Sequence, residues 1–337
     1  MKRLLQLFSV AAFAALGAMA QDEPVVRVDL EARGDYQRDY VDGEAIRDDS
    51  GFKGQYLNLR VRGEIAGHWA YDFRHRLNKT NFDSNFFDAT DWLYVNYSPN
   101  EHWTLSGGKQ VVGIGGWEYD RAPIDLYFCS EFWNKVPCYQ WGASVTHKFG
   151  ADALTFQFCQ SPFNSYYTNS DMYAYNLVWS GKHGVWRPLW SANMMEWSQG
   201  RFINYLALGN AFDLGKWTIE LDLMNRASNH QKFLLRDWSV MGEIAYRPCR
   251  AIKLYSHASY DQNDSGNSAD LLVHDGTEIT RVGAGVEYYP VKKFDIRLHA
   301  FYCFSWGTNT NPTGITQDRQ SLFSVGATWK IKVFEKK

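Results

Sequence analysis

Residues 55–79 read QYLNLRVRGEIAGHWAYDFRHRLNK, and they contain two runs in which apolar and polar side chains alternate. A period of two is typical of a β-strand and not of a helix. A three-residue turn centred on Gly67 would pair Ile65 with Trp69 and keep both apolar rows on one face of a hairpin. The other face is mainly charged, and only His75 interrupts the apolar row.

The same register predicts which side chains meet on the charged face. It sets Arg62 opposite Asp72, and Arg60 opposite Arg74. Directly opposed like charges are destabilising, so we expect this face to meet water and counter-ions. A long strand with one charged face and one apolar, aromatic-rich face is typical of a barrel wall between lipid and a water-filled interior. The hairpin therefore predicts an all-β fold, a transmembrane antiparallel β-barrel.

The rest of the mature chain repeats this pattern. Alternating segments between residues 26 and 333 predict about sixteen strands in one domain, residues 21–337. Long polar connections, such as residues 38–53 and 111–139, alternate with turns of three to five residues. Long extracellular loops and short periplasmic turns produce this rhythm in a barrel. Aromatic residues beside the short turns predict a ring at one membrane interface: Tyr97, Trp103, Phe149, Trp179, Trp186, Trp217, Tyr246, Tyr289, Phe294 and Phe334.

The first twenty residues have the pattern of a secretory signal. Lys2 and Arg3 precede a mostly apolar run, and small residues follow at positions 18 and 20. We therefore predict a cleaved signal peptide, residues 1–20, with the mature chain beginning at Gln21. No later segment approaches eighteen consecutive apolar residues, which argues against a transmembrane helix. The net charge of the whole chain is -2, and removal of two cations makes the mature chain more acidic, which argues against a nucleic-acid partner.

Five cysteines lie in the mature part of the chain. Export permits disulfides, and Cys129 and Cys138 share one long loop in which a bridge would be geometrically easy. The alternative is that all five are separate thiols that act as small apolar side chains.

An arginine ladder on the charged face of the hairpin is the first candidate for function. Its members, with Arg297 and Lys109 as further pore-lining candidates for anion selectivity, are Arg60, Arg62, Arg74 and Arg76. Glu64 and Asp72 would leave these four arginines with a local excess of positive charge, and such charge favours anions in a pore. The alternative is that each arginine pairs with a carboxylate and only stiffens the wall. Acidic residues on other inward faces make the lumen mixed: Glu220, Asp222, Glu243 and Glu287.

The loop of residues 111–139 is the second candidate. A connection this long in a compact protein is usually functional, and this one could fold into the barrel and narrow it. The alternative is a loop that stands outside on the surface. The candidate constriction residues are Trp117, Glu118, Tyr119, Asp120, Arg121, Asp125 and Lys135.

Catalysis finds little support. A membrane-barrel lipase needs adjacent Ser and His side chains on one face, whereas Ser256 and His257 are sequence neighbours and point to opposite faces. His147, His257 and His299 are scattered, without a triad or metal-ligand spacing. We predict no enzyme activity, no catalytic residue, no metal site and no cofactor.

Residues 103–113, WTLSGGKQVVG, resemble the strand through which phosphate-selective porins O and P of Gram-negative bacteria enter their long inward loop. The resemblance implies a passive diffusion channel in the cell outer membrane for small hydrophilic solutes or ions, with an anion (phosphate) preference, and a homotrimer in contact with membrane lipid. Two alternatives stay open. One is an outer-membrane transporter of hydrophobic substrates, which would need an N-terminal plug. The other is a secreted, soluble β-protein that binds carbohydrate and packs its apolar rows inside.

Overall fold

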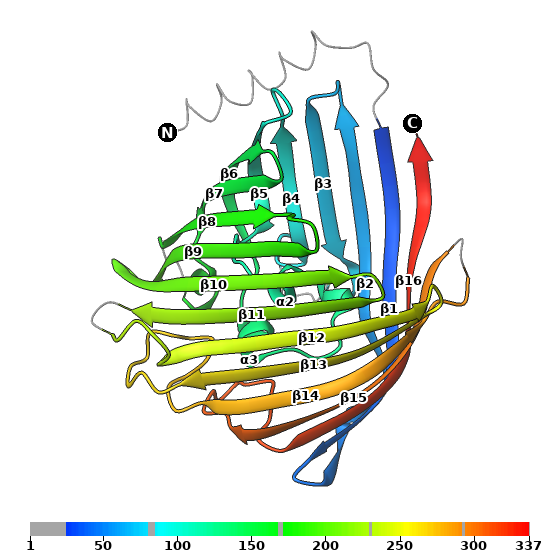
Figure 1. Cartoon of the computed structure of the whole chain (residues 1–337), viewed down its shortest axis with the longest axis vertical. Helices are drawn as coiled ribbons and strands as arrows, with labels where there is room; N and C mark the ends of the chain where they lie inside the picture. Colours follow the sequence, from blue (N-terminus) through cyan, green and yellow to red (C-terminus); the bar gives the residue numbers. More distant parts are fainter. Residues whose placement is uncertain (1–24, 80–84, 168–170, 229–230, 292–293, 337) are drawn as a thin grey trace.

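The computed structural model describes residues 25–79, 85–167, 171–228, 231–291 and 294–336, and these form a closed barrel (Figure 1). Each strand pairs antiparallel with its sequence neighbour, and β1 pairs with β16. The strands are β1 (Val25–Val41), β2 (Glu44–Ile65), β3 (Trp69–Arg76), β4 (Thr90–Tyr97), β5 (Trp103–Val111), β6 (Tyr139–Phe149), β7 (Asp152–Gln160), β8 (Tyr173–Gly181), β9 (Trp186–Ser198), β10 (Arg201–Leu214), β11 (Trp217–Ser228), β12 (Asp237–Cys249), β13 (Ile252–Asn263), β14 (Glu278–Tyr288), β15 (Asp295–Thr308) and β16 (Gln320–Lys336). The prediction of a sixteen-stranded antiparallel barrel is confirmed. The predicted signal peptide lies outside the described residues.

Short helical turns interrupt the connections. They are η1 (Leu77–Lys79), α2 (Trp117–Asp120), η2 (Pro123–Asp125), α3 (Glu131–Lys135) and η3 (Pro162–Tyr166). Among the described residues, no helix has the length and apolar character needed to cross a membrane.

The predicted hairpin forms in the predicted register. Ile65 pairs with Trp69, Arg62 with Asp72, and Arg60 with Arg74. His75 lies on the apolar face with its partner Leu59, but it is buried because the ring of Phe86 stacks on it at 4.5 Å between centroids. Its Nδ1 is 3.0 Å from Thr90 Oγ1, so the one polar residue in the apolar row has a hydrogen-bond partner.

The two faces of the barrel are opposite in character. Large apolar side chains such as Leu105, Phe156 and Ile331 are exposed on the outside, whereas charged side chains such as Asp35 and Arg226 are buried inside. A soluble β-protein would show the reverse arrangement, because its apolar rows must be removed from water. The distribution matches a wall that faces lipid on its outside.

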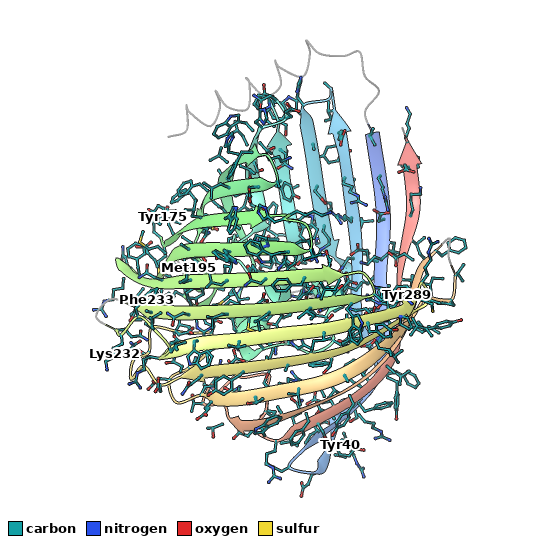
Figure 2. The ribbon with its side chains drawn as sticks, viewed as in Figure 1. Tyr40, Tyr175, Met195, Lys232, Phe233 and Tyr289 are labelled. Carbon is teal, nitrogen blue, oxygen red and sulfur yellow. The ribbon has the colours of Figure 1, made fainter. Side chains whose placement is uncertain are left out.

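The connections segregate by length as predicted, with one correction. Turns of two to six residues join β2–β3, β4–β5 and the later even-numbered pairs at one end, and most longer loops lie at the other end. In Figure 2, Lys232 and Phe233 lie at the long-loop end and Tyr289 lies at the short-turn end. The predicted polar loop of residues 38–53 is wrong: β1 and β2 continue as strands and meet at a turn of Asp42 and Gly43. Both turn residues have positive φ, 52° and 83°, as expected for the tightest hairpin turns.

The aromatic ring near the short turns is present with one exception. Trp103, Trp217 and Phe294 are exposed on the outer face. Tyr289 instead points into the barrel, where its hydroxyl donates a hydrogen bond to Glu287 at 2.6 Å. The exposed outer position beside that turn belongs to Tyr288. An amphipathic ring is stable between headgroups and hydrocarbon, which is why such residues collect at this level.

The interior of the barrel is not simply water-filled. An apolar core lies inside it, formed by the β5–β6, β7–β8 and β13–β14 loops and the inner faces of β7–β12. Its most buried members are Phe132, Phe163, Ala174, Ile203 and Val273. This core fixes the position of the long loop that crosses the lumen.

Candidate functional site in the barrel lumen

The β5–β6 loop, residues 112–138, leaves the wall and enters the lumen. At its base, the Val112 amide donates to the Cys138 carbonyl at 2.8 Å, so both ends of the loop stay together. The Gly115 amide then donates to Ser191 Oγ at 2.8 Å. A side chain at Gly209 would come within 2.7 Å of Gly116 Cα, so the absence of a Cβ there lets the loop lie directly on the wall.

Glu118 of α2 is the first anchor inside the barrel. Its buried carboxylate accepts hydrogen bonds from the amide and hydroxyl of Ser130 and lies 2.9 Å from His257 Nε2. The Glu118 amide donates to Asp222 on β11 at 2.8 Å. Two carboxylates and one imidazole therefore hold α2 against β11 and β13.

Arg121 joins the loop to the acidic part of the wall. Its guanidinium forms ion pairs with Glu220 of β11 and Glu243 of β12. Burial opposes the charged form, but Glu243 and Glu220 prevail and raise the pKa of Arg121 above its ordinary value. The arginine thus neutralises carboxylates that the sequence places on the inward face.

Asp125 joins the loop to the opposite part of the wall. Its carboxylate is 3.0 Å from Arg297 on β15 and 3.0 Å from Lys330 on β16. Burial raises the pKa of Asp125, but Lys330 and Arg297 outweigh burial and hold it below the ordinary value. A carboxylate with a lowered pKa stays charged as the pH falls toward that value, so this contact persists in mild acid. Arg33 on β1 also donates to the Leu126 carbonyl, so the loop reaches across the lumen.

The end of the loop is fixed by α3. The Glu131 amide donates to Asp261 at 2.8 Å, and the Glu131 carboxylate accepts from the amides of Ile315 and Thr316. Lys135 donates to the Thr313 carbonyl at 2.9 Å. The β15–β16 loop is therefore tied to the inward loop.

The seven predicted loop residues have different surroundings. Tyr119 is buried in the apolar core, and Trp117 donates through Nε1 to the Arg187 carbonyl while that guanidinium lies 4.3 Å from its ring. Asp120 is exposed, and Glu118, Arg121, Asp125 and Lys135 are the anchors described above. The loop lies inside the barrel and not on its surface.

Two members of the arginine ladder lie near open space. Arg60 bonds Asp72 through Nε at 3.0 Å and Nη2 at 2.5 Å, and Arg62 lies 3.3 Å from Asp29. Their side chains are 24% and 36% exposed. Both line a cavity of about 790 Å³ at the short-turn end of β1, β2 and β16. These are the ladder members that a dissolved ion can reach.

The other two ladder members are enclosed. Arg74 and Arg76 share Asp91 at 2.8 and 2.7 Å, with side chains 3% and 15% exposed. Arg74 also lies 3.7 Å over the Trp92 ring and donates to the Tyr139 hydroxyl. Arg74 is therefore a wall brace, and its prediction as a pore-lining residue is wrong.

Lys109 is also a correction. It lies directly opposite Leu93 and Trp141, whose side chains are exposed on the outer face, so it shares that face and does not point into the lumen. Lys109 Nζ donates a hydrogen bond to the Phe87 carbonyl at 2.6 Å. Folding of the β3–β4 loop over this place provides the partner that an outward lysine needs.

Some lumen residues were missed although their alternation was visible. The 790 Å³ cavity is also lined by Arg27, Lys330 and Lys332. A second cavity of about 280 Å³ lies beneath the loop, where Arg297 meets Glu287 and Arg121 meets Glu243. Arg27, Lys330 and Lys332 lie on inward rows of β1 and β16, so the sequence showed their facing but not that they gather at one end of the barrel.

All five cysteines are free thiols in the structure. Cys129 Sγ donates to Asn134 Oδ1 and Cys138 Sγ donates to the Val136 carbonyl, so the bridge between Cys129 and Cys138 does not form. Burial raises the pKa of both thiols. The alternative of separate thiols is the one that the structure supports.

Thiol labelling of the folded protein tests this result. We expect Cys249, the exposed cysteine, to react with a maleimide at once, and Cys129, Cys159 and Cys303 to react only after unfolding, because a buried protonated thiol is a poor nucleophile. Mass spectrometry without a reductant should find five labelled thiols in unfolded protein. Fewer labels in unfolded protein would contradict the free-thiol assignment.

Comparison with known proteins adds to this geometry. Residues 26–191 match the family model of phosphate-selective porin O and P. The barrel is similar to an anion-selective porin from Comamonas acidovorans, with a TM-score of 0.66, 12% identity, and coverage of 92% of this chain and 100% of that chain. It is similar to OmpT of Vibrio cholerae in its trimer form, with a TM-score of 0.64, 13% identity, and coverage of 92% and 100%. DcaP, an outer membrane channel of Acinetobacter baumannii, matches with a TM-score of 0.62, 11% identity, and coverage of 91% and 97%. No match was found among curated protein sequences.

Proposed function

We propose, from the premise that this chain is an outer-membrane porin of the phosphate-selective porin O and P-like family, that it prefers small hydrophilic anions as solutes. Its mechanism is electrodiffusion past the inward loop, without catalysis or a cofactor. Short turns face the periplasm and long loops face outward, as in barrels of this class.

The observation that carries this proposal is the charge around the 790 Å³ cavity. Five basic side chains line it, against Asp29, Glu31 and Asp295: Arg27, Arg60, Arg62, Lys330 and Lys332. Each of these cations has a carboxylate partner, Asp29, Asp72, Asp125 or Glu335, but in every pair the cation is the more exposed group, at 24–51% against 7–27%. A positive lining raises the local concentration of anions and their rate of entry.

We further propose that the inward loop is the constriction and that the protein assembles as a homotrimer after export by the signal peptide of residues 1–20. Support for the loop comes from its anchors on opposite parts of the wall, at Arg121 and Asp125. Support for the trimer is the similarity to OmpT, whose structure is a trimer form. Chemical cross-linking in detergent, followed by a denaturing gel, tests the assembly. A gel that shows only the monomer band would exclude the trimer.

Reversal potentials under a salt gradient test the preference for anions. In the Arg60→Ala/Arg62→Ala variant we expect the ratio of anion to cation permeability to fall by about twofold or more, because two cations are lost and their partner carboxylates are released into the cavity. Lys216→Ala is the matched control, since it removes an exposed cation from a short turn at the same end. An unchanged ratio in the double variant would refute the role of these arginines.

A further inference from the structure

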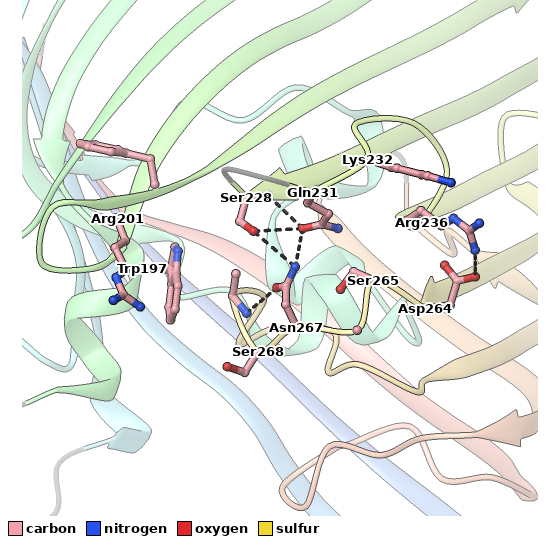
Figure 3. A pocket seen from close by; sticks show the side chains of 13 residues that line it. Trp197, Arg201, Ser228, Gln231, Lys232, Arg236, Asp264, Ser265, Asn267 and Ser268 are labelled. Atoms are coloured by element: carbon pink, nitrogen blue, oxygen red, sulfur yellow. Dashed lines mark hydrogen bonds and ion pairs between the residues drawn. The ribbon is translucent and has the colours of Figure 1, made fainter.

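A third cavity, of about 920 Å³, opens at the long-loop end, far from the charged lining described above. It lies between the end of β9, the start of β10, the β11–β12 loop and the β13–β14 loop. Figure 3 shows Trp197 and Arg201 on one side of this pocket and the pair of Arg236 and Asp264 on the other. We name it the mouth pocket.

The charge of the mouth pocket is positive. Arg201, Lys232 and Arg236 line it against one acid, Asp264. Arg236 lies 2.7 Å from Asp264. Arg201 and Lys232 are exposed and have no ion-pair partner within the described part of the chain. Two uncompensated cations in a concave site attract an anion.

One wall of the mouth pocket is an ordered set of neutral polar groups. Asn267 donates to Gln231 Oε1 at 2.9 Å and to Ser228 Oγ at 3.4 Å, and Ser228 Oγ donates to the same Gln231 oxygen at 3.1 Å. Figure 3 shows these three side chains in contact between the two loops. Gln231 Nε2 and Ser265 Oγ are buried and lack a hydrogen-bond partner among the described residues, so a ligand would reach them only after rotation of these side chains. Such a wall is pre-organised for a ligand with several hydroxyl groups.

The remaining wall is an indole. Trp197 lines the mouth pocket and packs against the apolar core. Ala269, a member of that core, also lines the pocket. A tryptophan fixed on one side presents a large, rigid apolar surface to a ring and keeps a polar edge for hydrogen bonding. The indole can stack on the apolar face of a sugar ring.

We propose that the mouth pocket captures an anionic sugar, a hexose phosphate or a hexuronate, before the solute passes the inward loop. The cations hold the phosphate or carboxylate, the indole holds the ring, and the amide and hydroxyl wall meets the sugar hydroxyls. This inference rests on the proposed function for its place in transport, but binding to the pocket does not require conduction.

The test uses the full protein in planar bilayers with glucose 6-phosphate added on the long-loop side. We expect the sugar phosphate to interrupt the ion current, with a half-blocking concentration that rises at least about tenfold in Trp197→Ala and in Arg201→Ala/Lys232→Ala, because each variant removes one element of recognition. Arg319→Ala is the matched control, since Arg319 is an exposed cation of the long-loop end that does not line the pocket. Equal block of the wild type and both pocket variants would overturn the inference.

Glucose and inorganic phosphate test the contributions of the sugar ring and of the charged group to binding separately. Each should block at least about tenfold more weakly than glucose 6-phosphate, since glucose lacks the charge and phosphate lacks the ring. If inorganic phosphate blocks as well as the sugar phosphate, Trp197 has no role and the inference is wrong. Bilayers with and without lipopolysaccharide separate a free solute from membrane carbohydrate: loss of block only with lipopolysaccharide would mean that lipid sugars occupy the pocket.

Calorimetry in detergent separates this inference from the proposed function. Glucose 6-phosphate should bind the wild type and Arg319→Ala equally, and the two pocket variants at least about tenfold more weakly. Binding without ion conduction would refute the channel proposal and keep the mouth pocket. Conduction without pocket-dependent binding would keep the channel and refute the mouth pocket.

Discussion

Replacement of residues 113–137 by a short Gly-Ser turn will raise the single-channel conductance by a factor of about two or more, because the loop occupies cross-section that would otherwise hold water and ions. The barrel should survive this change. Val111 already pairs with Tyr139, and the Val112 amide donates to the Cys138 carbonyl, so a tight turn needs only to close an existing hairpin. Conductance in symmetric salt measures the effect.

Lys216→Ala is the control for this deletion. Lys216 is an exposed cation of the short β10–β11 turn and lies outside the inward loop, so the conductance should stay close to that of the wild type. Heat-modifiable migration in detergent gels shows whether the deletion variant still forms a barrel. A folded deletion variant with unchanged conductance would show that the loop does not limit ion flow.

Much of the wall was predictable because lipid and water act on alternate residues of the same strand. The register of Arg62 and Asp72 followed from one turn residue, Gly67, since a shift by one position would exchange the two faces. The β1–β2 extension was missed for the same physical reason. Residues 44–56 of β2 include polar or small side chains on both faces, so no alternation marks them as strand.

Lys109 shows a different failure. Alternation from Trp103 and Leu105 places it on the outer face, but its charge pointed to the lumen. The structure resolves the conflict with the Phe87 carbonyl, which comes from a loop that folds over the outside of the wall. A charged side chain can occupy an apolar row when a distant segment supplies its hydrogen-bond partner. The alternation within one strand does not predict which segment will do so.

The sequence predicted which residues belong to the candidate site, but not which residues they contact. Arg121 was singled out in its loop, yet its partner Glu243 lies 122 residues further along the chain. The ladder arginines likewise pair with Asp29 and Asp91, which lie on neighbouring strands. The pairs with Asp29 and Asp91 form across adjacent strands, whereas the contact of Arg121 with Glu243 depends on the closed barrel around the inward loop.

Arg226→Ala will destabilise the barrel by about 3–5 kcal/mol, the usual cost of removing one partner from a buried ionic group. Arg226 is 0% exposed and lies 2.8 Å from Asp237 and 2.7 Å from Asp270, whose side chains are also buried. Its Nη1 donates to Ser239 at 2.9 Å. Without the guanidinium, two carboxylates remain in a place from which water is excluded.

Arg236→Ala is the matched control, because its ion pair has the same length as that of Arg226 and differs in exposure to water. Arg236 and Asp264 are also 2.7 Å apart, but their side chains are 45% and 43% exposed. Water stabilises each charge after the other is removed, so the expected loss is below about 1 kcal/mol. Urea unfolding of the refolded proteins in detergent, followed by gel mobility, compares the two variants.

Removal of the two unpaired carboxylates as well should restore most of the lost free energy of unfolding. The Arg226→Met/Asp237→Asn/Asp270→Asn variant keeps the volume of the group and carries no buried ion, and uncharged replacements of buried ion pairs are often close to neutral. Recovery would show that the stability depends on charge balance and not on the ion pairs themselves. Since Asp270 lies in the β13–β14 loop and the Arg226 guanidinium lies 5.6 Å over the ring of Phe132 in α3, the same group ties two long loops to the wall. Equal losses in Arg226→Ala and Arg236→Ala would therefore contradict both the buried ionic anchor and its role in holding the inward loop.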